Sequence, residues 1–253
     1  MSALAHLTWV LWLLGYPDHA SRRQAEGLAL AHRVGHKNTL GFALMYSALV
    51  GAFGRDDSAA AAHAAALLEL AREHKLDLWA ASATVVQGWA MARHGQEAAG
   101  IEAIQRGLAD WGKSDAAWMR PFFLGLLAEA CALSGDMQRG LGALDEALAV
   151  VEGTGERWPE AELYRLRGQL LAALPDGRPD EAIAAFQHAI EIARRQTATS
   201  WELRAATDLA RLWRHQGKHA EASDLLAPVH AWFSEGFETP DVQEAKALLD
   251  VLR

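Results

Sequence analysis

The segment Gly107–Ser114, GLADWGKS, fits the phosphate-binding pattern G-x-x-x-x-G-K-[ST]. In nucleotide-binding enzymes this pattern forms a loop between a β-strand and a helix, and the backbone N–H groups of the loop bind phosphate. Here the preceding residues, IEAIQR, have a helical pattern, and no apolar strand ending in an acidic residue is present to hold magnesium. We therefore interpret the match as accidental, with Gly107 in helix packing and Lys113 as a solvated lysine of the turn that follows the helix.

Histidine and cysteine side chains could bind a metal or attack a substrate, but their spacing favours neither. His32 and His36 are four residues apart without a cysteine or a carboxylate set nearby, and His215 and His219 straddle a glycine turn. Cys131, the only cysteine, lies in the apolar run ACAL, which indicates a buried small side chain. We expect no metal, no cofactor and no enzymatic activity.

The composition excludes several classes of protein. Of the 253 residues 51% are hydrophobic and 22% charged, and the net charge of −8 argues against nonspecific binding to nucleic acid. A single cysteine is typical of a reducing compartment, here the cytoplasm. The apolar run at residues 3–14 is shorter than the roughly 20 residues that span a bilayer, and it lacks the flanks of a signal peptide. We expect a buried or partner-facing helix there and no membrane segment.

Alanine, leucine, glutamate and arginine dominate the chain, which predicts helices. Glycines in short polar breaks recur at intervals of 39 to 42 residues, and a small residue follows each break near the start of the next helical segment. The glycines are Gly15, Gly54, Gly95, Gly135, Gly177 and Gly217, and the small residues are Ala20, Ala60, Gly100, Gly140, Ala182 and Ala222. Such a period indicates stacked helix hairpins.

The predicted fold is an all-α array of about six helix hairpins with a period of about 40 residues. A small residue in the first helix of each unit and an alanine near the start of the second resemble the tetratricopeptide (TPR) family, and this resemblance implies a right-handed, TPR-like α-solenoid. We expect one repeat domain over residues 1–253, closed by a capping helix at 239–253 with Pro240 at its first position. The predicted hairpin units are residues 1–38, 39–77, 78–116, 117–156, 157–199 and 200–236.

Two stretches resemble a known family. ERWPEAELYRLRGQLL and the stretch from SWELRAATDLARLWRHQGKHAEA to the C-terminus are similar to the C-terminal tetratricopeptide (TPR)-like repeat region of bacterial multidomain adenylate/guanylate cyclase–predicted ATPase proteins. The resemblance covers the whole chain and is sharpest over residues 156–253. It implies a regulatory or scaffolding segment without catalytic activity, with neighbouring cyclase or ATPase domains as partners.

In TPR-like arrays the first helix of each hairpin lines the concave surface. The register predicts apolar side chains there in the first four units and charged or polar ones in the last two. Aromatic residues and arginine are enriched at binding hot spots. The predicted partner-binding residues are Trp9, Trp12, Phe42, Met45, Trp89, Phe122, Glu129, Arg165, Gln169, Arg204, Arg211 and Arg214. Glu160, Glu162, Arg165 and Arg167 also have the spacing of helical ion pairs, interpreted as a solvated face.

The leading hypothesis is thus a protein-interaction domain that holds a protein segment in its groove, with Arg204, Arg211 and Arg214 binding a carboxylate or phosphate. A metabolite-sensing domain is the alternative, since a closed pocket would suit a small molecule and an open groove a peptide. Self-association through the apolar N-terminal end is compatible with the first hypothesis. No nucleic acid or membrane is expected as a partner.

Overall fold

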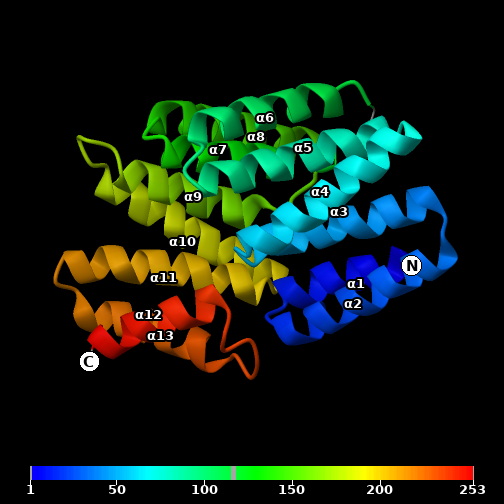
Figure 1. Cartoon of the computed structure of the whole chain (residues 1–253). Helices are drawn as coiled ribbons and strands as arrows, with labels where there is room; N and C mark the ends of the chain where they lie inside the picture. The colour runs from blue at the N-terminus through cyan, green and yellow to red at the C-terminus, as the bar shows by residue number, and fades with distance from the viewer. Residues whose placement is uncertain (1, 115–117, 253) are drawn as a thin grey trace. The chain divides into compact units, whose positions relative to one another are not determined.

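The computed structural model describes residues 2–114 and 118–252, and Figure 1 shows these residues as helices joined by short turns. Within them are thirteen helices and no strand. The helices are α1 (Ser2–Leu13), α2 (Pro17–Val34), α3 (Lys37–Phe53), α4 (Asp57–His74), α5 (Asp77–Arg93), α6 (Glu97–Trp111), α7 (Arg120–Leu133), α8 (Met137–Thr154), α9 (Glu160–Ala172), α10 (Pro179–Gln196), α11 (Thr199–His215), α12 (His219–Ala231) and α13 (Pro240–Leu252). The predicted all-α hairpin array is confirmed, with α13 as the capping helix.

The chain divides into two compact units. Unit 1 contains the described residues up to Val10 and from His19 to Glu156, and unit 2 contains Leu11–Asp18 and the residues from Arg157 onward. The turn between α1 and α2 thus belongs to the same unit as the C-terminal helices. The sequence prediction of a single domain stays a prediction, and its boundary between residues 116 and 117 lies outside the described residues.

Consecutive helices pack against each other from α3 to α8 in unit 1 and from α9 to α13 in unit 2, and first helices of successive hairpins also touch. In unit 1, α5 contacts α3 and α7 as well as its hairpin partner α6. In unit 2, α11 contacts α9 and α13 as well as α10 and α12. Helices α5 and α11 are therefore each covered by helices on several sides, which is how stacked hairpins bury faces that a single pair leaves exposed.

Residues in the polar breaks cap the first turn of some second helices. In the breaks before α4 and α8, the Oδ1 atoms of Asp56 and Asp136 accept hydrogen bonds from the backbone N–H groups of Ala59 and Arg139, at 2.9 and 3.1 Å. Such N-caps satisfy donors that have no partner inside the helix. Helix α13 begins at Pro240, as predicted.

The small residues that mark the repeat lie where helices cross closely. Ala20, Ala60, Ala182 and Ala222 have no exposed surface. A Cβ on Gly107 would lie 2.6 Å from Cγ2 of Val85, which confirms the packing role expected for this glycine. The alanine and glycine positions thus set the distance between neighbouring helices. No helix in the described ranges is long and apolar enough to cross a membrane.

Candidate functional site

The phosphate-binding pattern does not form a phosphate loop. Gly107 to Trp111 belong to α6, and Gly112, Lys113 and Ser114 lie in the turn that follows it. The segment therefore ends a helix instead of opening one, and a helix C-terminus carries negative partial charge, which disfavours an anion. The amine of Lys113 donates to Asp110 Oδ1 at 2.7 Å in full contact with solvent. The predicted placement is confirmed.

An open cleft of about 770 Å³ lies beside this segment in unit 1, between α6, α7 and α8. Its floor is apolar and its rim carries charged and amide groups. The lining residues among those described are Gln105, Leu108, Ala109, Trp111, Gly112, Lys113, Ser114, Arg120, Leu124, Leu127 and Glu146. None of the predicted partner-binding residues, all of which the structure describes, lines this cleft.

The histidine and cysteine candidates are placed apart from one another. His32, His36, His215 and His219 are exposed, and Nδ1 of His36 caps α3 by accepting from the N–H of Thr39. Cys131 is fully buried, and burial raises the pKa of its thiol. Among the described residues no group of three or more potential ligands could hold a metal ion.

Side chains from α1 and α3 form what we call the aromatic wall of unit 1: His6, Trp9, Phe42 and Tyr46. Tyr46 is its centre, with ring centroids 5.0 Å from His6, 5.6 Å from Trp9 and 4.5 Å from Phe42. The hydroxyl of Tyr46 lies 2.9 Å from Nε2 of His6, and burial raises the pKa of Tyr46 to about 12. Trp9 and Phe42 are half-buried, so each offers part of its ring to solvent.

Four of the predicted apolar binding residues are buried instead of exposed. Met45, Trp89 and Phe122 are 1%, 0% and 5% exposed, and Trp12 is 5% exposed. The predicted face of α3, α5 and α7 is covered because these successive first helices contact one another. The expectation that these four side chains line an open groove is therefore wrong for this structure.

Glu129, on α7, is held by two side chains of α5. One of its carboxylate oxygens accepts from Trp89 Nε1 and the other from Arg93, both at 2.9 Å. Arg93 also donates to Asp57 at the start of α4, and its guanidinium lies 5.2 Å from the centre of the Trp89 ring. Glu129 thus joins α4, α5 and α7, and its partners are groups of its own chain.

Unit 2 contains a row of paired charges that we call the ion-pair ladder: Glu162 and Arg165 of α9, Arg204, Asp208 and Arg211 of α11, and Asp241 and Glu244 of α13. Arg165 donates two hydrogen bonds of 2.8 Å to Glu162 and one of 2.7 Å to Asp208. Arg204 joins Glu162 to Asp241, at 3.2 and 2.8 Å. The ladder therefore connects all three helices through charge-assisted hydrogen bonds.

The inner part of the ladder is buried, and this corrects two expectations. The exposed fraction is only 8 to 9% for Glu160, Glu162, Arg165 and Arg204. The interpretation of the α9 pairs as a solvated face is therefore wrong for Glu160, Glu162 and Arg165. Arg204 was expected to bind a partner's anion, but carboxylates of its own chain already occupy its donors. The spacing on α9 revealed the pair but could not show that α11 and α13 bury it.

The charged neighbours in the ladder shift the pKa values of Glu162 and Arg165. Burial by itself would raise the pKa of Glu162, but the charges and hydrogen bonds of Arg165 and Arg204 lower it to about 2. Burial opposes the charge of Arg165, yet Glu162 and Asp208 hold the pKa of Arg165 above its ordinary value. Glu162 and Arg165 are therefore both charged near neutral pH.

The outer part of the ladder is open to solvent. Arg211 donates to Asp208 at 2.8 Å and lies 3.5 Å from Glu244, with 42% of its side chain exposed. Gln169 is exposed and donates to Asp208 at 2.9 Å, and Arg214 is exposed at the end of α11. Of the predicted polar binding residues, these three are the ones within reach of a partner.

Trp12 and Arg204, predicted to bind a partner from opposite ends of the sequence, contact each other in unit 2. The Arg204 guanidinium lies 5.1 Å from the centre of the Trp12 ring, and Trp12 also packs edge-on against Trp201 at 6.5 Å. No sequence signal marks this contact, because nothing in a 40-residue period relates the first turn to the sixth hairpin.

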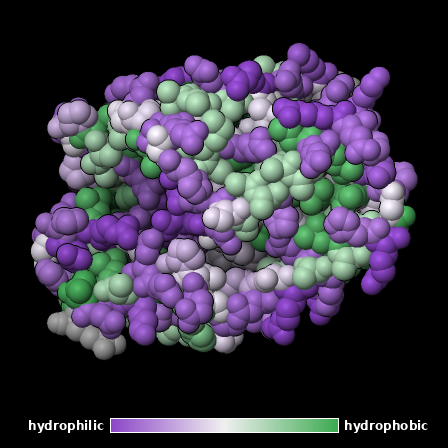
Figure 2. All heavy atoms as spheres, viewed as in Figure 1, coloured by the Kyte–Doolittle hydropathy of each residue, from purple (hydrophilic) through white to green (hydrophobic). Residues whose placement is uncertain are grey.

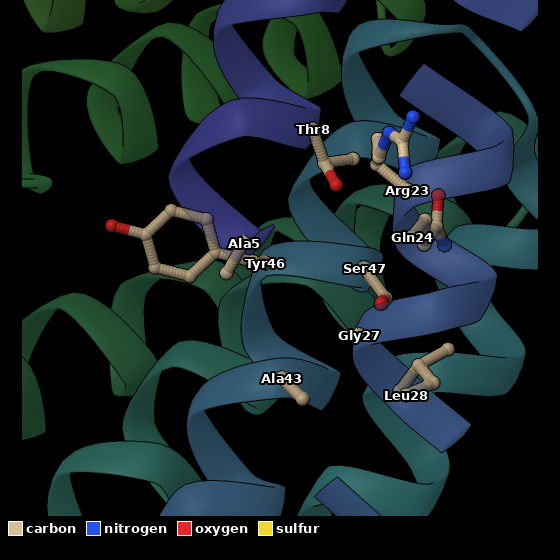
Figure 3. Close-up of a pocket in the computed structure, with 9 residues that line it drawn as sticks. All are labelled: Ala5, Thr8, Arg23, Gln24, Gly27, Leu28, Ala43, Tyr46 and Ser47. Atoms are coloured by element: carbon tan, nitrogen blue, oxygen red, sulfur yellow. The ribbon is translucent and has the colours of Figure 1, made fainter. Parts of the chain in front are cut away.

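A small cavity between α1, α2 and α3 is shown in Figure 3. Its volume is about 10 Å³, close to that of one water molecule. Thr8, Arg23, Gln24 and Ser47 supply its polar lining. The cavity is too small for a ligand.

The viewed face in Figure 2 is mostly hydrophilic, with apolar patches between the charged side chains.

Comparisons with known proteins agree with the geometry. Residues 122–194 match the tetratricopeptide repeat family model. Two solved structures of Podosopora anserina putative kinesin light chain nearly identical TPR-like repeats are 17% and 18% identical, each with a TM-score of 0.51. They cover 74% and 78% of this chain, and the matches extend over 92% and 95% of theirs. At this identity they support the fold alone.

An uncharacterized protein of Rhizobium meliloti (strain 1021) is 29% identical over 210 residues. The match covers 83% of this chain but only 20% of the relative, so the chain spans about a fifth of that protein's length. The array of helix hairpins is thus TPR-like, and TPR-like repeats typically bind protein partners.

Proposed function

We propose that this chain is a non-catalytic protein-interaction domain that binds a protein segment through the aromatic wall of unit 1. The supporting observation is that Trp9 and Phe42 are half-buried around Tyr46, which fixes them by ring contacts on both sides. Aromatic rings that are rigid and partly exposed give a large contact area at low entropic cost, and they are enriched at hot spots.

The chemistry of the partner follows from the two surfaces. The aromatic wall suits apolar or aromatic side chains. The hydrogen bond between Tyr46 and His6 adds a polar group to it. Gln169, Arg211 and Arg214 in unit 2 suit carboxylates or phosphates, since guanidinium groups bind both. An apolar segment therefore fits the aromatic wall of unit 1, and an acidic segment fits the exposed polar residues of unit 2.

The proposal also extends to the cellular role of the chain. The resemblance to multidomain cyclase–ATPase proteins and the short share of the Rhizobium meliloti relative that is matched both support a scaffold inside a longer bacterial signalling protein. In that role the neighbouring domains would be the partners, in the cytoplasm, where a single buried thiol such as Cys131 is stable.

The test begins with capture of partners from a bacterial lysate on the immobilised chain, followed by calorimetry with the purified partner. Trp9→Ala and Phe42→Ala should each weaken binding at least about 30-fold, as hot-spot residues do. Leu7→Ala is the matched control, because Leu7 is an exposed apolar residue of the same helix as Trp9. Wild-type affinity in both aromatic variants would refute the proposal.

A second candidate function is binding of a small molecule in the cleft beside Lys113, whose volume lies in the usual range of such sites. A thermal-shift screen of metabolites on the wild-type chain and on Arg120→Ala tests it. Arg120 lines the cleft, so a stabilising ligand that binds there should lose its effect in the variant. Ligands that stabilise both proteins equally would rule out the cleft.

A further inference from the structure

The turn between α1 and α2 differs from the other tight turns of the chain. Gly15, Gly95 and Gly135 occupy the same place in their hairpins and all have positive φ, +91°, +80° and +82°. A Cβ on Gly95 or Gly135 would meet nothing within 4 Å, but on Gly15 it would lie 2.6 Å from the ring of Trp232 and 3.2 Å from that of Phe233. The first turn alone among these three is covered by other residues.

The cover comes from residues about 200 positions away, all within unit 2. Ser200 Oγ donates to the backbone oxygen of Trp12 at 2.6 Å. The N–H of Asp18 donates to Glu235 Oε1 at 3.0 Å, and the N–H of Gly236 donates to Asp18 Oδ2 at 3.2 Å. Hydrogen bonds in both directions, with the backbone taking part on each side, specify one orientation of the turn.

Aromatic contacts fill the space between these hydrogen bonds. Tyr16 and Trp232 have ring centroids 5.3 Å apart, and the Trp12 ring contacts both Arg204 and Trp201. Gly236 has no room for a side chain, because a Cβ there would overlap Pro17. The sequence of the turn, WLLGYPD, therefore supplies an aromatic ring, a glycine, a tyrosine, a proline and an acid, each with its own contact.

We propose that Ser200, Arg204, Trp232, Phe233, Glu235 and Gly236 form a binding surface for a helix-hairpin turn, and that its occupant is residues 11–18 of the same chain. A partner then reaches Trp12 and Arg204 only after this turn has left the surface. The contact joins segments that a stacked array does not otherwise bring together, because repeats normally touch only their sequence neighbours.

Amide hydrogen exchange of the full chain tests the proposal without any partner. The N–H groups of Tyr16, Gln96 and Asp136 make the same turn hydrogen bond, to Leu11, Met91 and Cys131, at 2.9, 3.0 and 3.0 Å. Local hydrogen bonding is thus matched, and only Tyr16 lies in a covered turn. The protection factor of Tyr16 should exceed the other two at least about tenfold, the effect of one further hydrogen bond of ordinary strength.

Trp232→Ala is the diagnostic variant, and Phe237→Ala is its control, since both are large exposed apolar residues of the same region, at 45% and 56%. Trp232→Ala should lower the protection of Tyr16 at least about tenfold and leave Gln96 and Asp136 unchanged, which also shows that unit 1 stays folded. Phe237→Ala should leave all three unchanged.

Three results would overturn the proposal. Equal protection of Tyr16 and Gln96 in the wild-type chain would show that the turn is not covered in solution. Unchanged protection of Tyr16 in Trp232→Ala would show that this surface is not what covers it. Protection of Tyr16 that rises with protein concentration would show that the surface takes the turn of a second copy instead.

Discussion

Replacing Glu162 by glutamine removes one charge from the centre of the ion-pair ladder and keeps the size of the side chain. The carboxylate accepts two hydrogen bonds from Arg165 and one from Arg204, and its side chain is 10% exposed. In the variant an amide NH₂ group faces guanidinium donors, and two buried cations each lose a partner. Breaking a buried pair in this way costs about 3–5 kcal/mol.

The pKa gives a second route to the same magnitude. A pKa of about 2 against an ordinary value of 4.5 corresponds to about 3 kcal/mol of stabilisation of the folded state. Because the folded pKa lies below the unfolded one, this contribution is complete above pH 4.5 and is lost as the pH falls toward 2. The stability difference between wild type and Glu162→Gln should shrink over the same interval.

Urea unfolding of the full chain, followed by circular dichroism at several pH values, measures both effects. Glu26→Gln is the control, since Glu26 pairs with Arg23 on an exposed surface and should change stability by no more than about 1 kcal/mol. A loss below about 1 kcal/mol in Glu162→Gln at neutral pH, or a difference that does not depend on pH, would refute the assignment of a buried ladder.

Three further predictions concern unit 1. Gly88→Ala should destabilise the protein by about 1–3 kcal/mol, because the new Cβ would lie 2.6 Å from the carbonyl oxygen of Gly100; thermal unfolding should show the opposite sign for Gly142→Ala, a helical position with open space around it. In a spectrophotometric titration Tyr46 should stay protonated until about pH 12, and Tyr46→Phe should remove that last step and no earlier one. Calorimetry with ATP and magnesium should show no heat of binding that depends on Lys113, so Lys113→Ala should match the wild type, and a signal abolished by the substitution would restore the phosphate-loop interpretation.

The fold could be predicted from the sequence because each step of the prediction depends on local properties. Helix propensity, glycine in the tight turns and a small residue at each crossing all recur every 39 to 42 residues, and each acts within one hairpin or between neighbours. The same locality let the sequence place Gly107 at a close crossing and Lys113 in a turn. The predicted start of α13 at Pro240 is correct for the same reason.

The faces of the first helices were harder to predict. The register of the repeat shows which residues lie on one side of a helix, but it does not show how close the next first helix lies. In unit 1 that distance is set by small residues on other helices, so Met45 and Trp89 become core while Trp9 and Phe42, at the start of the array, keep part of their rings exposed.

The contact between Trp12 and Arg204 could not be predicted at all. Its two residues lie in different repeats and do not occupy equivalent positions in those repeats. Covariation among relatives can reveal a contact between distant repeats, whereas helix propensity and residue spacing cannot.

The polarity gradient along the chain also has a different meaning in the structure. The sequence places apolar side chains on the early first helices and charged ones on the later first helices, which we interpreted as two ends of a ligand groove.

In the structure the same difference in polarity describes how the first helices contact each other. In unit 1, α3, α5 and α7 are joined mainly by apolar side chains, with polar links from Trp79 to Asn38 and from Trp89 and Arg93 to Glu129. In unit 2, α9, α11 and α13 are joined by the ion-pair ladder. Most of the gradient is therefore used inside the protein. A partner is left with the residues at the margins of each set: Trp9 and Phe42 where the apolar stacking begins, and Gln169, Arg211 and Arg214 where the ladder reaches solvent.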